Sequence, residues 1–238
     1  MKLSQILDGI EKELDMKIDD RSANGLQVGN EKEVRKVGFA VDATIDSFQK
    51  AKDKNCGLLI VHHGIIWSDG EKTITGNKYN KAEFLIKNDL ALAAYHLPLD
   101  AHPKLGNNAQ ISEMLGAKNL KPFDAGFTAE LRKDTGIEAL GIELGRMLNT
   151  KCTVFAFGKP LFKNIAVISG FGGKDVERAS RTADCFITGE VMYGIKNLAK
   201  ELKTNVITAG HYETETPGLK ALMEFLKKRT SLELEWIE

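Results

Sequence analysis

The stretch "VRKVGFAVDATIDSFQKAKDKNCGLLIVHH", Val34 to His63, decides the fold class of this chain. Its two ends are apolar runs rich in β-branched residues, which is typical of strands. The middle places apolar residues at helical spacing, beginning with Ile45 and Phe48. A strand, a helix and a second strand in this order predict a βαβ unit whose two strands run parallel. The following segment continues this order, with a second helix and then a third strand over Ala91 to Tyr95.

A second copy of this pattern lies in the other half of the chain. The segment "IAVISGFGGKDVERASRTADCFITGEV" aligns without a gap on the segment that begins at Val37, with Ile165 on Val37. In this alignment His62 falls on Glu190. Few residues are identical, so we interpret the match as a repeated supersecondary unit. Independent convergence on a common βαβ pattern is the alternative.

The rest of the second half has the same alternating character. A helix is predicted over Ile137 to Leu148, a strand over Asn205 to Ala209, and a helix that starts near Thr214 to Pro217, because proline is tolerated in a first turn. No low-complexity linker separates the halves. We therefore predict an α/β fold of two related lobes, with mixed, partly parallel sheets that share one interface. The predicted lobes are residues 1–125 and 126–238, with the functional residues converging at the lobe interface.

Composition excludes several classes of protein. The chain has 238 residues, 42% of them hydrophobic, which is enough for a substantial core. Lysine plus arginine equals aspartate plus glutamate at 33 each, which argues against nucleic-acid binding. No apolar run approaches the roughly 20 residues of a membrane span. The N-terminus lacks the signal-peptide pattern, and the three cysteines form no CxxC pair. These features predict a cytoplasmic protein without membrane partners.

Polar side chains follow nearly every predicted strand of note. In open α/β sheets ligands collect at the carboxyl ends of strands, so residues there are candidates for a site. Imidazoles and carboxylates without thiolates suit zinc, manganese or iron, and paired metals commonly activate water. The sequence therefore predicts a metal site with enough ligands for two ions. The candidates are His62, His63, His96, Asp100, Glu190, His211 and Glu215.

Some neighbouring features have simpler interpretations. Adjacent strand residues point to opposite faces, so His62 and His63 could share a site only if the chain leaves strand geometry there, which Gly64 permits. We interpret His102 as a surface or supporting residue and Trp67 as a packing residue. The glycine-rich "SGFGGKD" matches neither dinucleotide nor P-loop patterns, and we interpret it as a tight strand-to-helix turn.

Five segments in order resemble a known family. They are "NGLQVG" from Asn24, "VHHGIIW" from Val61, "YHLPLDAHPKLGNNAQ" from Tyr95, "ITGE" from Ile187 and "GHYETE" from Gly210. Their order and spacing are similar to those of the dinuclear-metal family named for the NGG-interacting factor, many of whose bacterial members are labelled GTP cyclohydrolase I type 2 homologs. The chain resembles the short form, which lacks the central domain of longer members.

This resemblance implies a toroidal homohexamer with a dimetal centre in each subunit, holding two divalent ions such as zinc, iron or manganese. The implied ligands are His62, His63, Asp100, His211 and Glu215, with Glu215 as the bridge. The resemblance places His96 beside the metals as a supporting or proton-transfer residue, and in a cyclohydrolase either His96 or Glu190 would move protons. Many members carry proline after the paired histidines, where this chain has Gly64.

The resemblance leaves three functions open. The first is a metal-dependent hydrolase acting on a nucleotide or related heterocycle, with GTP cyclohydrolase, which opens the guanine imidazole ring and releases formate, as the named candidate. The second is a protein that stores, delivers or inserts metal without turnover. The third is an interaction scaffold, for which the sequence offers no charged or aromatic tract. A triphosphate substrate calls for basic residues, and the motif segments contain no arginine.

Overall fold

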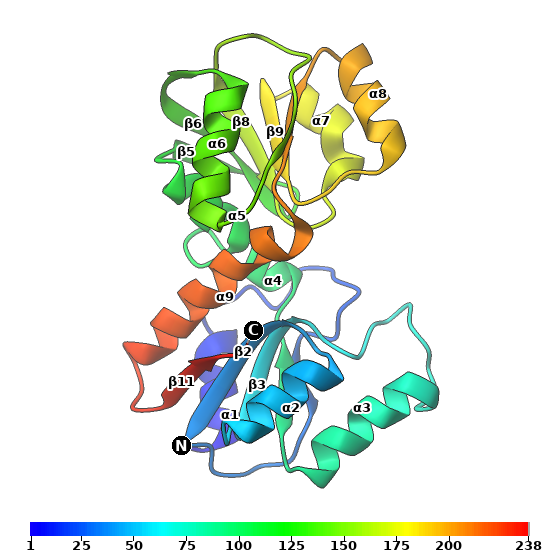
Figure 1. Cartoon of the computed structure of the whole chain (residues 1–238). Helices are drawn as coiled ribbons and strands as arrows, with labels where there is room; N and C mark the ends of the chain where they lie inside the picture. Colours follow the sequence, from blue (N-terminus) through cyan, green and yellow to red (C-terminus); the bar gives the residue numbers. More distant parts are fainter. Residues whose placement is uncertain (238) are drawn as a thin grey trace. The chain divides into compact units, whose positions relative to one another are not determined.

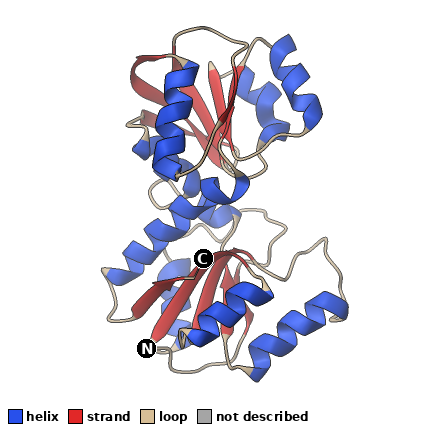
Figure 2. Ribbon diagram, in the orientation of Figure 1, coloured by secondary structure: helices blue, strands red, loops and turns tan. Residues whose placement is uncertain are grey.

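The structure is a computed structural model that describes residues 1–237, and it divides into two compact units. The first unit comprises Met1–Leu99 and the segment from Leu219 onward, and the second comprises Asp100–Gly218. Each unit combines a sheet with helices (Figure 2). The mixed α/β fold class predicted from the sequence is thereby confirmed.

The first unit is built on a five-stranded sheet with the order β1-β4-β3-β2-β11. Strands β2, β3, β4 and β11 are parallel, and β1 is antiparallel to β4. The predicted βαβ unit is present as β2, α2 and β3. The strands are β1 (Gly25–Val28), β2 (Lys36–Asp42), β3 (Leu58–His63), β4 (Ala91–Ala94) and β11 (Glu233–Trp236).

Helices cover both faces of this sheet (Figure 1). Helix α1 (Leu3–Glu11) buries a stripe of apolar residues spaced three and four apart on one face. Helices α2 (Ile45–Asp53) and α3 (Gly76–Lys87) pack on the other face through Phe48 and Leu85. Helix α2 begins where the Thr44 hydroxyl accepts a 3.0 Å hydrogen bond from the Ser47 amide. The short helix α4 (Leu97–Asp100) follows β4.

The second unit has a six-stranded sheet with the order β5-β6-β8-β9-β10-β7. Strands β8, β9 and β10 are parallel, and the other pairings are antiparallel. The strands are β5 (Lys118–Phe123), β6 (Gly126–Thr135), β7 (Thr153–Phe155), β8 (Phe162–Ile168), β9 (Cys185–Thr188) and β10 (Asn205–Thr208).

Strict alternation along these strands separates two cores. Ile165 and Val167 of β8 face α5 (Asn107–Met114) and α6 (Ile137–Leu148), whereas Ala166 and Ile168 face α7 (Val176–Ser180) and α8 (Tyr193–Glu201). A single turn of 3₁₀ helix, η1 (Gly173–Asp175), leads into α7. The helix predicted over residues 137–148 is confirmed at both ends.

The division of the chain differs from the predicted boundary at residues 125 and 126. The first unit ends at Leu99, and the chain from Leu219 belongs to it again. The physical reason is that β11 pairs in parallel with β2, with Glu233 opposite Lys36. A pairing between segments so far apart leaves no mark in local composition.

Helix α9 (His211–Lys227) begins earlier than predicted. Pro217 lies inside the helix, although its lack of an N–H removes one hydrogen bond to the preceding turn. The Thr216 hydroxyl donates to the Glu213 carbonyl at 3.2 Å, which replaces the bond that Pro217 cannot make. As a result His211 and Glu215 lie four residues apart on one helical face.

The two βαβ units differ in register by one residue. In the first unit Val37 lies opposite Leu58, and in the second unit Ile165 lies opposite Cys185. The connection in the second unit is therefore one residue shorter, so the gapless alignment is wrong along its second strand. The residue equivalent to Glu190 is His63, not His62.

Among the described residues, no helix combines the length and the apolar character that crossing a membrane requires.

Candidate metal centre

Three histidines gather at the carboxyl ends of β3 and β4 in the first unit. Each of His62, His63 and His96 offers a ring nitrogen, and these nitrogens lie within 4.8 Å of one another. The ring centroids of His62 lie 4.9 Å from those of both His63 and His96. Because β3 and β4 are parallel neighbours, their ends meet at one edge of the sheet, as the sequence predicted.

Both paired histidines belong to β3, so the expectation that the chain must leave strand geometry between them is wrong. At the end of a strand, both rings can extend past the sheet edge toward the same point. Gly64 serves a different purpose, because a Cβ there would lie 2.3 Å from the Gln27 side-chain amide. Gln27 accepts hydrogen bonds from the amides of Ile65 at 2.7 Å and Ile66 at 3.1 Å. Gln27 thus fixes the turn after the histidine pair.

In all three histidines the Nδ1 atom is held by a hydrogen bond. The Nδ1 atom of His62 donates to the Tyr95 carbonyl, that of His63 to the Asp42 carboxylate, and that of His96 to the Asp20 carboxylate, each at 2.9 Å. This arrangement makes Nε2 the nitrogen that could coordinate a metal. Metal-binding histidines in proteins are held by such partners on their other nitrogen.

Asp20 and Asn24 hold His96 in place. Asp20 also accepts from the Leu97 amide at 2.9 Å and from the Asn24 side chain at 2.8 Å, and Asn24 accepts from the His96 amide at 2.7 Å. Burial acts to raise the pKa of Asp20, but the hydrogen bonds from His96, Asn24 and the Ser22 amide together outweigh it and lower the pKa well below its usual range. Asp20 therefore carries a negative charge next to the ring.

In the second unit His211 lies between two carboxylates. Its Nδ1 atom is 2.8 Å from Glu190 Oε1, and its Nε2 atom is 3.2 Å from Glu215 Oε1. The hydrogen bond to Glu215 is the main cause that raises the pKa of His211 to about 9, against the lowering effect of burial. Without metal the ring is an imidazolium near neutral pH, so a metal ion would replace its proton.

Gly170 makes room for this pair. It has φ +61°, and a Cβ at this position would lie 2.1 Å from Glu215 Oε1 and 3.0 Å from His211 Nε2. Its amide donates to the Thr214 hydroxyl at 3.0 Å. The glycine-rich segment is a strand-to-helix turn, as interpreted from the sequence, and its first glycine also lets a buried carboxylate approach the backbone.

Asp100 is buried in the second unit, and neutral donors hold it. Its Oδ1 atom accepts from the Asn107 side chain at 2.8 Å and from the Ser169 hydroxyl at 3.1 Å. The Asn108 side chain donates to the Asp100 carbonyl at 3.2 Å. These contacts fix the direction of the carboxylate.

The Nδ1 atom of His102 accepts hydrogen bonds, whereas that of each clustered histidine donates one. Its Nδ1 atom accepts hydrogen bonds from the amides of Leu105 at 2.8 Å and Lys104 at 3.2 Å. The ring therefore closes a turn, which agrees with the supporting role expected for it.

Apart from Glu190, sequence reasoning missed the side chains that orient the candidate ligands. Asp42 carried a usable signal, since it ends the strand next to β3 and lies opposite His63. Asp20, Asn24 and Gln27 lie in a turn-rich segment whose polar residues have no periodicity. Only the fold brings them to the histidines.

The donor set fits a divalent metal. Imidazole nitrogens and carboxylate oxygens suit zinc, iron and manganese, and both clusters present these donors from rigid strand ends and a helix. The molecule is therefore a two-unit α/β protein with histidine and carboxylate groups that could bind metal.

The whole chain, residues 1–238, matches the model of the Duf34/NIF3 (NGG1p interacting factor 3) family. The protein belongs to this family, which confirms the resemblance seen in the five segments. A protein from Pyrococcus horikoshii is 40% identical over 226 residues, covering 92% of this chain and 90% of that protein. One from Borreliella burgdorferi is 40% identical over 223 residues, covering 92% and 89%. Both are named GTP cyclohydrolase 1 type 2 homolog.

Solved structures share the fold over its full length. Protein ybgI, described as of unknown function, superimposes with a TM-score of 0.93 at 33% identity, covering 100% of this chain and 98% of that one. Reduced HcgD from Methanocaldococcus jannaschii superimposes with a TM-score of 0.90 at 29% identity, with the same coverage.

Proposed function

We propose that this protein is a dinuclear metal-dependent hydrolase that acts on a nucleotide or a related heterocycle. One observation carries the proposal: the histidines of both clusters donate through Nδ1 to a fixed acceptor, whereas His102, outside the clusters, accepts through Nδ1. The name of the relatives, GTP cyclohydrolase 1 type 2 homolog, supports GTP as the candidate substrate.

Four of the proposed ligands belong to the two clusters, and Asp100 is proposed in addition to them. When bound, two divalent ions supply Lewis acidity and lower the pKa of water, so that it can attack at neutral pH. Glu215 is proposed as the bridging carboxylate, because a carboxylate has two oxygens to share and this one is only 3% exposed. The five proposed ligands are His62, His63, Asp100, His211 and Glu215.

His96 is proposed to move protons. Asp20 fixes the orientation of its ring, so that Nε2 can accept a proton from water and return it to a leaving nitrogen. Glu190 is the second candidate, although its contact with the Nδ1 atom of His211 favours an orienting role.

The test is formate release from GTP by metal-free protein reloaded with zinc, manganese or iron. A His62→Ala/His63→Ala variant with a circular dichroism spectrum like that of the wild type is the control. We expect metal-dependent formate production that the variant loses. Two bound metals without formate would rule out the cyclohydrolase activity.

His96→Ala should leave the metal content unchanged and lower the hydrolytic rate by about 10²–10⁴-fold, the usual contribution of a positioned acid or base. Elemental analysis and the formate assay measure the two effects separately. If the variant loses its metal, His96 is a ligand and the proton-transfer assignment is wrong.

Metal storage or delivery is the second candidate function. The side chain of His211 is 36% exposed, and exchange of a metal requires ligands that solvent or a partner can reach. Metal transfer to a chelator faster than any turnover would favour this function.

The toroidal hexamer implied by the family and the cytoplasmic location predicted from the sequence features are also proposals. Light scattering of the purified protein tests the assembly, and cell fractionation tests the location.

A further inference from the structure

A cavity of about 430 Å³ lies in the first unit, next to the turn that follows the histidine pair. Gly64 and Trp67 line it on the side of β3, and Glu71, Lys78 and Lys81 line it on the side of α3. Its volume falls within the range of small-molecule pockets, about 300–1,000 Å³. The proposed hydrolase function does not use this cavity.

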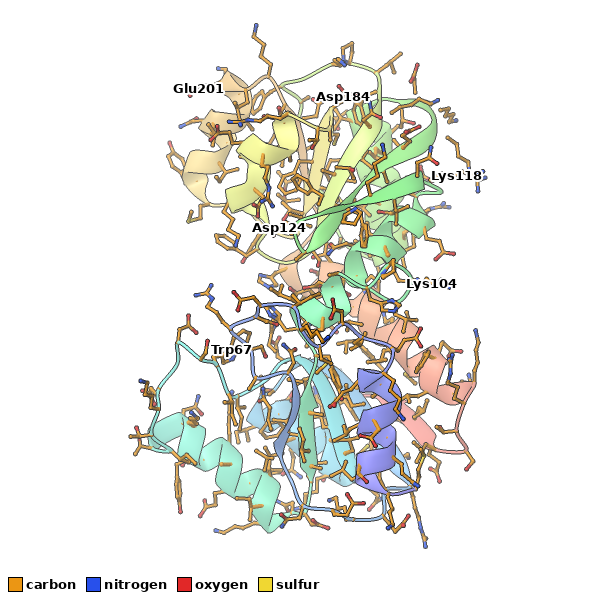
Figure 3. The ribbon with its side chains drawn as sticks, turned by 180° about the vertical axis from the view of Figure 1, so that it is seen from behind. Trp67, Lys104, Lys118, Asp124, Asp184 and Glu201 are labelled. Atoms are coloured by element: carbon orange, nitrogen blue, oxygen red, sulfur yellow. The ribbon has the colours of Figure 1, made fainter. Side chains whose placement is uncertain are left out.

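Trp67 connects the cavity to the histidine cluster. It lies in the loop between β3 and α3 (Figure 3). Its ring centroid is 5.2 Å from that of His96, in an edge-on arrangement, and 6.3 Å from that of His63. The indole N–H donates to the Gly64 carbonyl at 3.0 Å, which fixes the ring. A molecule in the cavity would therefore contact an aromatic side chain that also contacts the candidate metal ligands.

Two lysines give the cavity its charge. Lys78 and Lys81 are half-buried and lie three residues apart on α3, so they occupy the same face of the helix. The Lys81 ammonium donates to the Ala43 carbonyl at 2.6 Å, and the Lys78 ammonium donates to the Glu71 carbonyl at 2.6 Å. These bonds hold each ammonium in place and use one of its three N–H groups. The cavity lining carries two ammonium groups against the single carboxylate of Glu71.

We propose that this cavity binds the phosphate of a substrate whose planar ring contacts Trp67 and extends toward the histidine cluster. The inference rests on the proposed function and names its substrate class, a phosphate-bearing heterocycle such as a nucleotide. Lysine ammonium groups bind phosphate as point charges, and any base can stack on an aromatic side chain. The motif segments contain no arginine, and α3 supplies basic side chains in its place.

The experiment uses the fluorescence of Trp67. The chain contains two tryptophans, so Trp236→Phe leaves Trp67 as the single reporter. The metal-loaded variant is titrated with GMP, guanosine and inorganic phosphate. We expect GMP to quench Trp67, with guanosine and inorganic phosphate each binding at least tenfold more weakly.

Substitutions in α3 locate the contact. Lys78→Gln and Lys81→Gln should each weaken GMP binding by tenfold or more, and metal content should not change. Lys87→Gln is the matched control, because Lys87 lies in the last turn of the same helix and pairs with Glu83 at 2.9 Å. It should bind GMP like the parent protein.

Three results would overturn the inference. They are equal affinity for guanosine and GMP, equal affinity for inorganic phosphate and GMP, and wild-type binding in both the Lys78 and Lys81 variants. Formate assays on the same proteins separate this inference from the proposed function. Lysine-dependent GMP binding without formate release rules out the cyclohydrolase activity and supports the cavity, whereas formate release with KM unchanged by both substitutions refutes the cavity alone.

Discussion

The two βαβ units of this protein share a scaffold and use it differently. In the first unit β2 ends at Asp42 and β3 ends at His63, which lie opposite each other and are hydrogen-bonded through their side chains. Once the one-residue difference in register is included, the equivalent residues in the second unit are Gly170 and Glu190. There the Glu190 amide donates to the Gly170 carbonyl at 3.0 Å.

The comparison shows an exchange of roles at matching positions. In the first unit the second strand supplies the imidazole and the first strand supplies the carboxylate that orients it. In the second unit the second strand supplies the orienting carboxylate, Glu190, and α9 supplies the imidazole, His211. In the second unit Gly170 stands at the position equivalent to Asp42, and the Glu215 side chain fills the space beside it. The sheet edge is the common element, and the donors are specific to each unit.

The largest effect is expected from Glu215→Gln, which removes a charged candidate metal ligand of the second unit. A neutral amide is a poor bridging ligand, so the variant should lose the bound pair of metals. Elemental analysis of purified protein measures the loss. Glu224→Gln, on the same helix and 55% exposed, is the control and should keep its metal. Wild-type metal content in Glu215→Gln would contradict the bridge.

Gly170→Ala tests whether the second unit needs a glycine at the position that Asp42 occupies in the first unit. The added Cβ would overlap with Glu215, and a left-handed conformation costs a non-glycine residue about 1–2 kcal/mol. We expect this loss in the free energy of unfolding, measured with urea, together with weaker metal binding. Gly194→Ala adds a Cβ into open space on α8 and should be neutral or slightly stabilising. Equal stability of both variants would mean that Gly170 is not required.

Asp42→Ala and Glu190→Ala test the exchange of roles directly. If both carboxylates orient an imidazole, each substitution should weaken metal binding by about 10–100-fold without removing a ligand. Titration calorimetry with zinc gives the affinities. A large effect in only one variant would show that the two units are not equivalent in this respect.

The smallest effect concerns pH and the metal-free protein. The pKa of His211 is raised to about 9, so its bonds to Glu190 and Glu215 stabilise the fold fully below pH 6.5, and this contribution is lost as the pH rises through 9. Because the side chain is 36% exposed, we expect a change of no more than about 1 kcal/mol. Urea unfolding at pH 6.5 and pH 9.5 measures it. The His211→Gln protein should lack this difference, and a stability of the wild type that rises over this range relative to the variant would contradict the sign.

Much of the fold follows from local patterns. The apolar runs at β2 and β3 and the helical spacing between them predict the βαβ unit, and the periodicity of residues 137–148 predicts α6. The start of α9 was missed because Pro217 was taken as a first-turn signal, whereas the Thr216 hydroxyl compensates for it inside the helix. The candidate histidines of the first unit were visible because the ends of parallel strands lie at one edge of their sheet.

The sequence by itself determined which donors this protein has and which segments form strands and helices, because both depend on residues close together in the chain. It also determined the family, through five short segments in a specific order. The tertiary structure alone decided that the Nδ1 atom of each candidate histidine is held by a hydrogen bond, since its partners, Tyr95, Asp42, Asp20 and Glu190, come from other segments. It also decided the one-residue difference in register and the return of β11 to β2. Pairing between distant segments depends on packing across the whole sheet, which no local pattern records.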